Sequence, residues 1–357
     1  MKIKDIIGRK RMKDYIKINR ALDNQYLKAI EENITNLRKQ GLYPEKFTYP
    51  ITLQFELTGR CNLACKHCYN RSGDADRETL MTPDKWCSLA KEIVKDGGIF
   101  QCILSGGEPL LLGDRLFDIM DILHDDGTSF VVITNGYLLT KEKVKRFSKY
   151  RYYWFQVSID GSTAEIHDEF RGVRGSFERA VNGALEISQA GIPLVIAHTV
   201  TPKNLGKVED MVDLAYSMGA SRIILGEVLP SGRAITNEDI ILTKEQKNCL
   251  YEVISKLQNK YNEKIEIRRS ADLGHQMKRY SLENNAGGII RPNGEFRLDC
   301  MAPFIIGNVL NTSLKELWMK HGINAWKSER VQKFIASINE ETQKGNIQNH
   351  VDKDILV

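Results

Sequence analysis

From residue 52 onward, the pattern of apolar and polar residues switches regularly between two types, one strand-like and one helical. Short segments, either alternating or mainly apolar, read as β-strands, and each is followed by a segment with the roughly 3.6-residue period of an amphipathic helix. The six strand-like segments are residues 52–57, 100–104, 130–134, 154–159, 194–200 and 222–226. This order predicts an α/β fold with a parallel sheet and helices outside it.

Six strand-helix units can close part of a barrel, so we predict a partial (β/α)6 barrel that resembles a TIM barrel. Capping residues support the helices: Thr82 precedes Pro83, Ser176 opens a helical pattern, and Thr243 with Gln246 forms a capping box. In folds of this kind the functional loops follow the carboxyl ends of the strands. Candidate chemistry should therefore lie just after each strand-like segment.

The pattern differs at both ends of the chain. Residues 1–49 are amphipathic with a helical period and predict a helical N-terminal extension. After Tyr261 the pattern indicates a strand at 264–268, a hairpin within 287–300 around Pro292-Asn293-Gly294, and a helix at 312–320. We divide the chain into a helical extension, a partial barrel, a small α+β C-terminal subdomain and a polar, frayed tail, at residues 1–49, 50–240, 241–345 and 346–357.

Composition narrows the class of protein. With 357 residues, 42% of them hydrophobic, the chain can bury a full core. It has neither an apolar run of about 20 residues nor a signal-peptide core, so we expect a cytoplasmic protein without a membrane partner. Residues 1–49 hold 12 of the Lys and Arg residues and 6 of the Asp and Glu residues, which leaves about −1 of the net charge of +5 for the rest. A basic arm could bind nucleic acid or an acidic peptide, but a solvated helical face is the commoner explanation.

Three cysteines carry the clearest chemical signal. Cys61, Cys65 and Cys68 lie four and three residues apart, directly after the first strand-like segment. The remaining cysteines of the seven are scattered, which argues for reduced thiols and against a disulfide framework. A structural zinc site needs four ligands, and no fourth Cys or His stands at normal spacing. Three thiolates on one short loop therefore predict an open metal site.

Other polar motifs follow the next strand-like segments in order. Ser105-Gly106-Gly107-Glu108-Pro109 follows the second, Asn135-Gly136 the third, and Ser158 with Asp160 ends the fourth. Glu169 and Arg171 come soon after and could simply pair with each other. Four successive strand ends with such residues indicate one shared site.

These motifs resemble the radical S-adenosylmethionine (SAM) superfamily over about residues 50–235. The cysteines match its CxxxCxxC signature, followed by the aromatic Tyr69, and residues 106–109 match its GGEP motif. In that family the three thiolates bind one 4Fe-4S cluster, and the fourth iron binds the amino and carboxylate groups of SAM. One electron then cleaves a carbon-sulfur bond and yields a 5′-deoxyadenosyl radical.

The resemblance also implies residues that hold SAM. Gly106 and Gly107 would let the backbone approach the methionine part, while Glu108 would hold the ammonium group or fix the turn. Ser158 and Asp160 lie two positions apart on one strand face and would contact the ribose. The other candidates for this cofactor site are Asn135, His198 and Arg233. Of these, Arg233 would pair with the methionine carboxylate, and His198 could instead be an ordinary hydrogen-bonded interior histidine.

The C-terminal part resembles the SPASM/twitch extension of radical enzymes that modify peptides, at residues 288–300, 306–309 and 313–318. That extension normally holds one or two auxiliary iron-sulfur clusters. Here Cys300 is the only cysteine after residue 250, so we expect the fold without an auxiliary cluster. Cys300 is then a candidate hydrogen donor to a product radical, although most free cysteines are buried apolar residues.

We therefore expect a radical SAM enzyme that abstracts hydrogen from a ribosomally made peptide and causes epimerisation or crosslinking, with an electron donor such as flavodoxin or ferredoxin. An alternative is a small-molecule substrate such as a sugar, nucleoside or amino acid. A third hypothesis is a non-catalytic, metal-bound scaffold that binds a peptide.

Overall fold

The computed structural model describes residues 32, 34–41, 47–74, 79–270, 273–282, 287–338 and 354–357. Most of the predicted N-terminal extension and residues 346–353 of the predicted tail lie outside these residues. Within the extension, residues 34–39 are helical as expected.

The described strands form one sheet in the order β11-β10-β9-β8-β1-β2-β3-β4-β5-β6-β7. They are β1 (Thr52–Glu56), β2 (Gln101–Ser105), β3 (Ser129–Thr134), β4 (Tyr152–Ser158), β5 (Leu194–Val200), β6 (Arg222–Glu227), β7 (Glu266–Arg269), β8 (Gly287–Ile290), β9 (Glu295–Arg297), β10 (Phe304–Asn308) and β11 (Ile355–Leu356). Strands β1 to β7 are all parallel. The predicted partial barrel is confirmed, with β7 as a further parallel strand beside β6.

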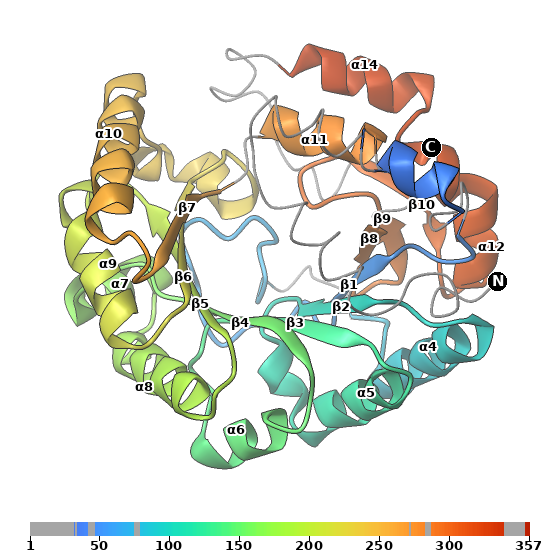
Figure 1. Ribbon diagram of the computed structural model, residues 1–357, viewed down its shortest axis with the longest axis horizontal. Helices are drawn as coiled ribbons and strands as arrows, with labels where there is room; N and C mark the ends of the chain where they lie inside the picture. The colour runs from blue at the N-terminus through green and yellow to red at the C-terminus, as the bar shows by residue number, and fades with distance from the viewer. Residues whose placement is uncertain are drawn as a thin grey trace.

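Helices cover the outside of this sheet. Figure 1 shows β1 to β7 as an arc with α4, α5, α6, α8, α9 and α10 on its outer side. The barrel helices are α4 (Pro83–Asp96), α5 (Asp114–Asp125), α6 (Lys141–Phe147), α7 (Ala164–Arg171), α8 (Ser176–Gln189), α9 (Val208–Ser217) and α10 (Lys244–Lys260). The helices of the C-terminal part are α11 (Leu273–Leu282), α12 (Leu314–Leu317), α13 (Ile323–Ala325) and α14 (Glu329–Ser337). Among the described residues, no helix is both long and apolar enough to span a bilayer.

The two faces of the barrel strands differ in exposure. Outward side chains such as Leu104, Val132 and Phe155 are fully buried under the helices. Inward side chains such as Ile133 and Ser158 are only partly buried. Because this alternation recurs on β2 to β6, the barrel lumen is partly open to solvent, and a ligand could enter it.

The start of the functional loop is fixed by core packing. Trp86 on α4 packs against Phe55 of β1, with the rings tilted and their centroids 4.8 Å apart. Its indole N–H donates to the carbonyl of Leu57 at 3.1 Å. Trp86 is fully buried, so the end of β1 is anchored to the outer helix layer just before the cysteines.

The C-terminal part continues the sheet on the other side of β1. Strand β8 pairs with β1 in parallel and with β9 in antiparallel, which confirms the predicted hairpin. One sheet therefore contains strands from both sides of residue 240, and the domain boundary proposed at that residue stays a prediction. The predicted frayed tail is wrong for residues 354–357, because β11 pairs with β10 and Asp354 forms ion pairs with the buried Arg291 and Arg297.

Candidate active site

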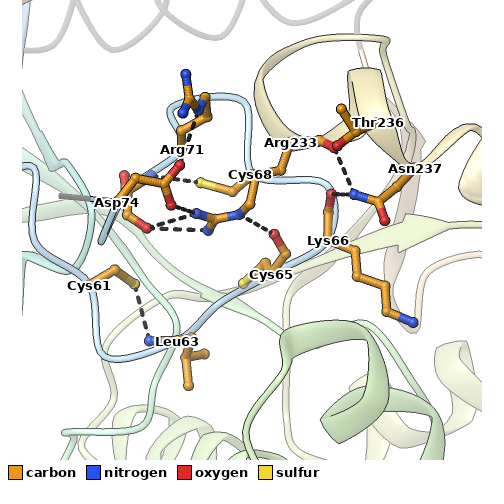
Figure 2. Close-up of polar contacts among 11 residues, drawn as sticks. Cys61, Leu63, Cys65, Lys66, Cys68, Arg71, Asp74, Arg233, Thr236 and Asn237 are labelled. Atoms are coloured by element: carbon orange, nitrogen blue, oxygen red, sulfur yellow. Dashed lines mark hydrogen bonds and ion pairs between the residues drawn. The ribbon is translucent and has the colours of Figure 1, made fainter. Parts of the chain in front are cut away.

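The three cysteines lie on one loop, residues 57–74, which we call the cysteine loop. Each sulfur accepts an N–H bond: Cys61 from the backbone of Leu63 at 3.5 Å, and Cys68 from that of Ser72 at 3.4 Å. Cys65 accepts from the guanidinium of Arg171 at 3.6 Å. Figure 2 shows the loop with its three cysteines. Hydrogen bonds of this kind stabilise thiolates and the sulfurs of iron-sulfur clusters.

Burial opposes these hydrogen bonds, because it disfavours the charged thiolate form of the cysteines. It raises the pKa of Cys61 to about 12, and it also raises the pKa of Cys65. Without metal the thiols of Cys61 and Cys65 are therefore protonated, and metal binding must release those protons. Among the described residues, no three His, Cys, Asp or Glu side chains lie close enough to share one metal ion. A 4Fe-4S cluster instead takes each thiolate on a different iron, which suits three cysteines with separate N–H donors.

The GGEP turn after β2 packs directly on the cysteine loop. The backbone N–H of Gly107 donates to the carbonyl of Thr58 at 2.7 Å, and that of Glu108 donates to the carbonyl of Arg60 at 2.9 Å. A Cβ on Gly107 would lie 1.9 Å from the Arg60 carbonyl oxygen, and one on Gly106 2.7 Å from that of Thr58. Two glycines are needed here because the two backbones touch.

Replacing Gly107 by alanine should separate the turn from the cysteine loop. We expect reconstituted protein to hold at least about 10-fold less cluster, the size of effect seen when the supports of metal ligands are removed. Iron and sulfide per chain measure this. Gly206→Ala is the control, because a Cβ there meets nothing within 4 Å. Equal cluster content in the two variants would contradict the steric account.

Glu108 fixes the turn, one of its two expected roles. It is fully buried, and its carboxylate accepts from the hydroxyl of Thr134 at 2.7 Å and from the backbone of Asn135 at 2.8 Å and Leu110 at 3.1 Å. Burial raises the pKa of this carboxyl group, while these donors oppose the shift. The contacts tie the end of β3 to the GGEP turn.

Asn135 lies beside the cysteine loop. Its side-chain amide donates to Asn62 at 2.9 Å and approaches the sulfur of Cys61 at 3.8 Å. The structure thus brings the end of β3, the GGEP turn and Cys61 together, as the order of strand ends led us to expect.

Ser158 and Asp160 do not share a face. Ser158 is partly exposed on the lumen side of β4, whereas Asp160 is fully buried. Asp160 pairs with the guanidinium of Arg171 at 2.6 Å and accepts from the backbone of Thr199 at 2.6 Å. Burial alone would raise the pKa of Asp160, but Arg171, two histidines and the N–H of Thr199 together outweigh burial and hold the pKa below its usual range. The expected ribose contact of Asp160 is not supported by this placement, and that of Ser158 stays a prediction.

The sequence placed Arg171 near the shared site but indicated no role for it beyond a possible pair with Glu169. The expected pair between Glu169 and Arg171 is wrong, since Glu169 pairs instead with Lys66 at 3.0 Å and Lys203 at 2.5 Å. Arg171 connects Asp160 to the sulfur of Cys65. Gly172 after it allows close contact, because a Cβ there would lie 2.9 Å from the carbonyl oxygen of Ala64. The sequence does not show that Arg171 is buried next to the metal-ligand candidate Cys65, because this contact exists only in the folded chain.

His198 points away from the lumen. It lies on the fully buried face of β5 together with Ile196 and Val200, and its Nδ1 hydrogen-bonds the carbonyl of Ile159 at 2.9 Å. The structure therefore favours the ordinary interior histidine over a contact to SAM. His167 of α7 is also fully buried, and its Nδ1 accepts from the backbone N–H of Asp160 at 3.1 Å.

His167 should make stability depend on pH. Burial, helped by Arg171, lowers its pKa from 6.5 to about 4. The folded state resists protonation, so stability is full above the ordinary value and is lost as pH falls toward 4. We expect a loss of up to about 3 kcal/mol from this group. Denaturant unfolding at several pH values should give a flatter profile for His167→Asn, which keeps an acceptor but cannot titrate; parallel profiles would contradict the assignment.

Cys300 lies near a partly buried hydrogen bond, 2.7 Å long, from the hydroxyl of Tyr69 to the carboxylate of Glu56. The thiol donates to Asp299 at 3.7 Å. Burial raises the pKa of Cys300 well above its usual value, with Asp299 and Glu56 adding to the shift. The thiol thus keeps its hydrogen, as a hydrogen donor must, and this role stays a prediction. Glu56 was not singled out from the sequence, although a carboxylate on the inward face of a strand is a signal.

Comparison with known proteins agrees with this site. Residues 55–215 match the Radical SAM superfamily profile. The chain is 36% identical over 191 residues to the AdoMet-dependent heme synthase of Methanosarcina barkeri, covering 54% of each protein. It is 27% identical to the antilisterial bacteriocin subtilosin biosynthesis protein AlbA of Bacillus subtilis over 76% of this chain and 60% of that protein.

The fold has solved counterparts. The crystal structure of Streptococcus suis SuiB bound to precursor peptide SuiA matches with a TM-score of 0.62 at 16% identity, over 91% of this chain and 74% of that one. The chain spans about half the length of the heme synthase and more of the other two. Residues 55–215, which include the cysteine signature, therefore form a radical SAM domain.

Proposed function

We propose that this protein is a radical SAM enzyme that modifies a ribosomally made peptide, by epimerisation or crosslinking. The observation that carries the chemistry is the cysteine loop, whose three sulfurs each accept an N–H bond beside the GGEP turn. The fold match to a structure titled with a precursor peptide, and the match to a bacteriocin biosynthesis protein, support a peptide substrate.

The residues have separate tasks in this proposal. Cys61, Cys65 and Cys68 would hold a 4Fe-4S cluster, which when bound would supply the one electron needed for reductive cleavage of SAM and hydrogen abstraction from the substrate. Gly106 and Gly107 present backbone groups to the methionine part of SAM. Ser158 contacts the ribose with its hydroxyl from the lumen side of β4. Cys300 donates a hydrogen atom to the product radical.

The cluster requires an electron donor and a reducing compartment. A flavodoxin or ferredoxin would supply the electron. All seven cysteines are free thiols in this structure, and three of them must stay reduced to bind iron, so we place the enzyme in the reducing environment of the cytoplasm.

A small-molecule substrate is the second candidate, favoured by the 36% identity with a protein named for heme synthesis. Anaerobic reaction in deuterated water separates the two. Synthetic peptides representing every residue type, and an iron porphyrin precursor of heme, would be incubated with enzyme, SAM and reductant and then weighed.

The mass change of each substrate distinguishes the possible classes of reaction. Deuterium gain in a peptide indicates epimerisation, and loss of two hydrogens indicates a crosslink or desaturation. Loss of carbon dioxide from the porphyrin with every peptide unchanged would overturn the peptide proposal and favour the small molecule.

A further inference from the structure

The segment after β6 runs along the cysteine loop and binds its carbonyl groups. The backbone N–H of Arg233 donates to the carbonyl of Cys68 at 3.0 Å. The side-chain amide of Asn237 approaches the carbonyl of Lys66 at 3.4 Å. Gly232 permits this contact, because a Cβ there would lie 2.2 Å from the carbonyl oxygen of Cys68.

The side chain of Arg233 makes most of these contacts. Its Nε donates to the carbonyl of Cys65 at 2.9 Å, and both terminal nitrogens donate to the carbonyl of Ser72 at 3.2 Å. One terminal nitrogen also pairs with Asp74 at 2.6 Å. Figure 2 shows this guanidinium between two arms of the cysteine loop. A planar guanidinium offers five donors in a rigid fork, so one side chain can bind two carbonyls and a carboxylate at once.

These bonds have a consequence for the sulfurs. The carbonyls of Cys65, Cys68 and Ser72 are engaged by Arg233, while the N–H of Ser72 is directed at the sulfur of Cys68 and Arg171 approaches that of Cys65. The carbonyl oxygens of Cys65 and Ser72 thus face the guanidinium and that of Cys68 faces the backbone N–H of Arg233, whereas N–H donors face the sulfurs of Cys65 and Cys68. N–H donors stabilise the more negative, reduced form of an iron-sulfur cluster and so raise its reduction potential.

We infer that Arg233 is a positioning residue that holds the cysteine loop in the shape required by the cluster. It thereby sets both the strength of cluster binding and the reduction potential of the cluster. This replaces the expected pairing of Arg233 with the methionine carboxylate. The inference rests on the proposed function, since it concerns the cluster that Cys61, Cys65 and Cys68 would bind.

Three variants test it in the full chain, reconstituted without oxygen. Arg233→Gln removes the cation and most of the donors, and Arg233→Lys keeps the charge without the fork. Asp74→Asn removes the ion pairs of Asp74 with Arg233 and Arg71 and leaves the bonds from Arg233 to the carbonyls in place. The rate of cluster loss to an iron chelator, the reduction potential and the spectrum of the reduced cluster in electron paramagnetic resonance are measured. Circular dichroism checks that each variant folds.

We expect Arg233→Gln and Arg233→Lys to lose cluster about 10- to 100-fold faster than wild type, with a lower reduction potential and an altered spectrum. Asp74→Asn should change the rate by less than about 5-fold, as for a partly exposed ion pair. If Arg233→Gln does not fold, Arg233→Lys decides the matter. Wild-type rate, potential and spectrum in Arg233→Lys would overturn the inference, whereas a wild-type protein that binds no cluster would overturn the proposed function itself.

Discussion

Alanine at Cys61, Cys65 or Cys68 is expected to abolish binding of the iron-sulfur cluster. Each of the three thiolates would hold a different iron, so no remaining ligand can replace the missing one. The neighbouring donors, such as Leu63 N–H and Arg171, would then face an empty position. Iron and sulfide analysis of reconstituted protein, together with its absorbance, measures the loss.

The control for this prediction is Cys249→Ala. Cys249 is an exposed thiol on α10, so the same substitution there should leave the cluster content at the wild-type level. A variant at Cys61, Cys65 or Cys68 that keeps its full iron and sulfide would refute the assignment of the cysteine loop.

Replacing Arg171 by glutamine is expected to have the largest effect on stability. Arg171 and Asp160 are both buried and pair at 2.6 Å, so removing the cation leaves the carboxylate uncompensated. Breaking a buried ion pair in this way costs about 3–5 kcal/mol. Denaturant unfolding measures the change in the free energy of unfolding.

An exposed pair provides the comparison. Arg115→Gln breaks the ion pairs of Arg115 with Asp84 and Asp118 on the surface, which should cost less than about 1 kcal/mol. In addition, Asp160→Asn should recover part of the loss caused by Arg171→Gln, since the unpaired charge is removed. A loss in Arg171→Gln no larger than that in Arg115→Gln would show that the buried pair is not important for stability.

Local sequence patterns predicted the parts of the fold that depend on neighbours in the chain. The capping box of Thr243 and Gln246 forms as expected, and so does the turn between β8 and β9. The close approach of Gly106 and Gly107 to the cysteine loop could also be expected, because strand ends of a parallel sheet meet at one edge.

Contacts between distant segments could not be predicted in this way. The alternation rule placed Ser158 and Asp160 on one face, but the chain leaves the strand after Ser158 and Asp160 turns to Arg171. Asp354 likewise reaches Arg291 across 63 positions, and a polar segment near the end of the chain carries no pattern that indicates such a partner. Arg233 was identified as functional, yet most of its partners are backbone carbonyls, which every residue possesses.

The proposal depends most directly on cleavage of SAM. Reconstituted wild-type protein, incubated without oxygen with SAM and dithionite, should form 5′-deoxyadenosine, and Cys65→Ala should form none. A wild-type protein that binds its cluster and SAM but forms no 5′-deoxyadenosine, with dithionite or with reduced flavodoxin, would contradict the account and favour a non-catalytic scaffold.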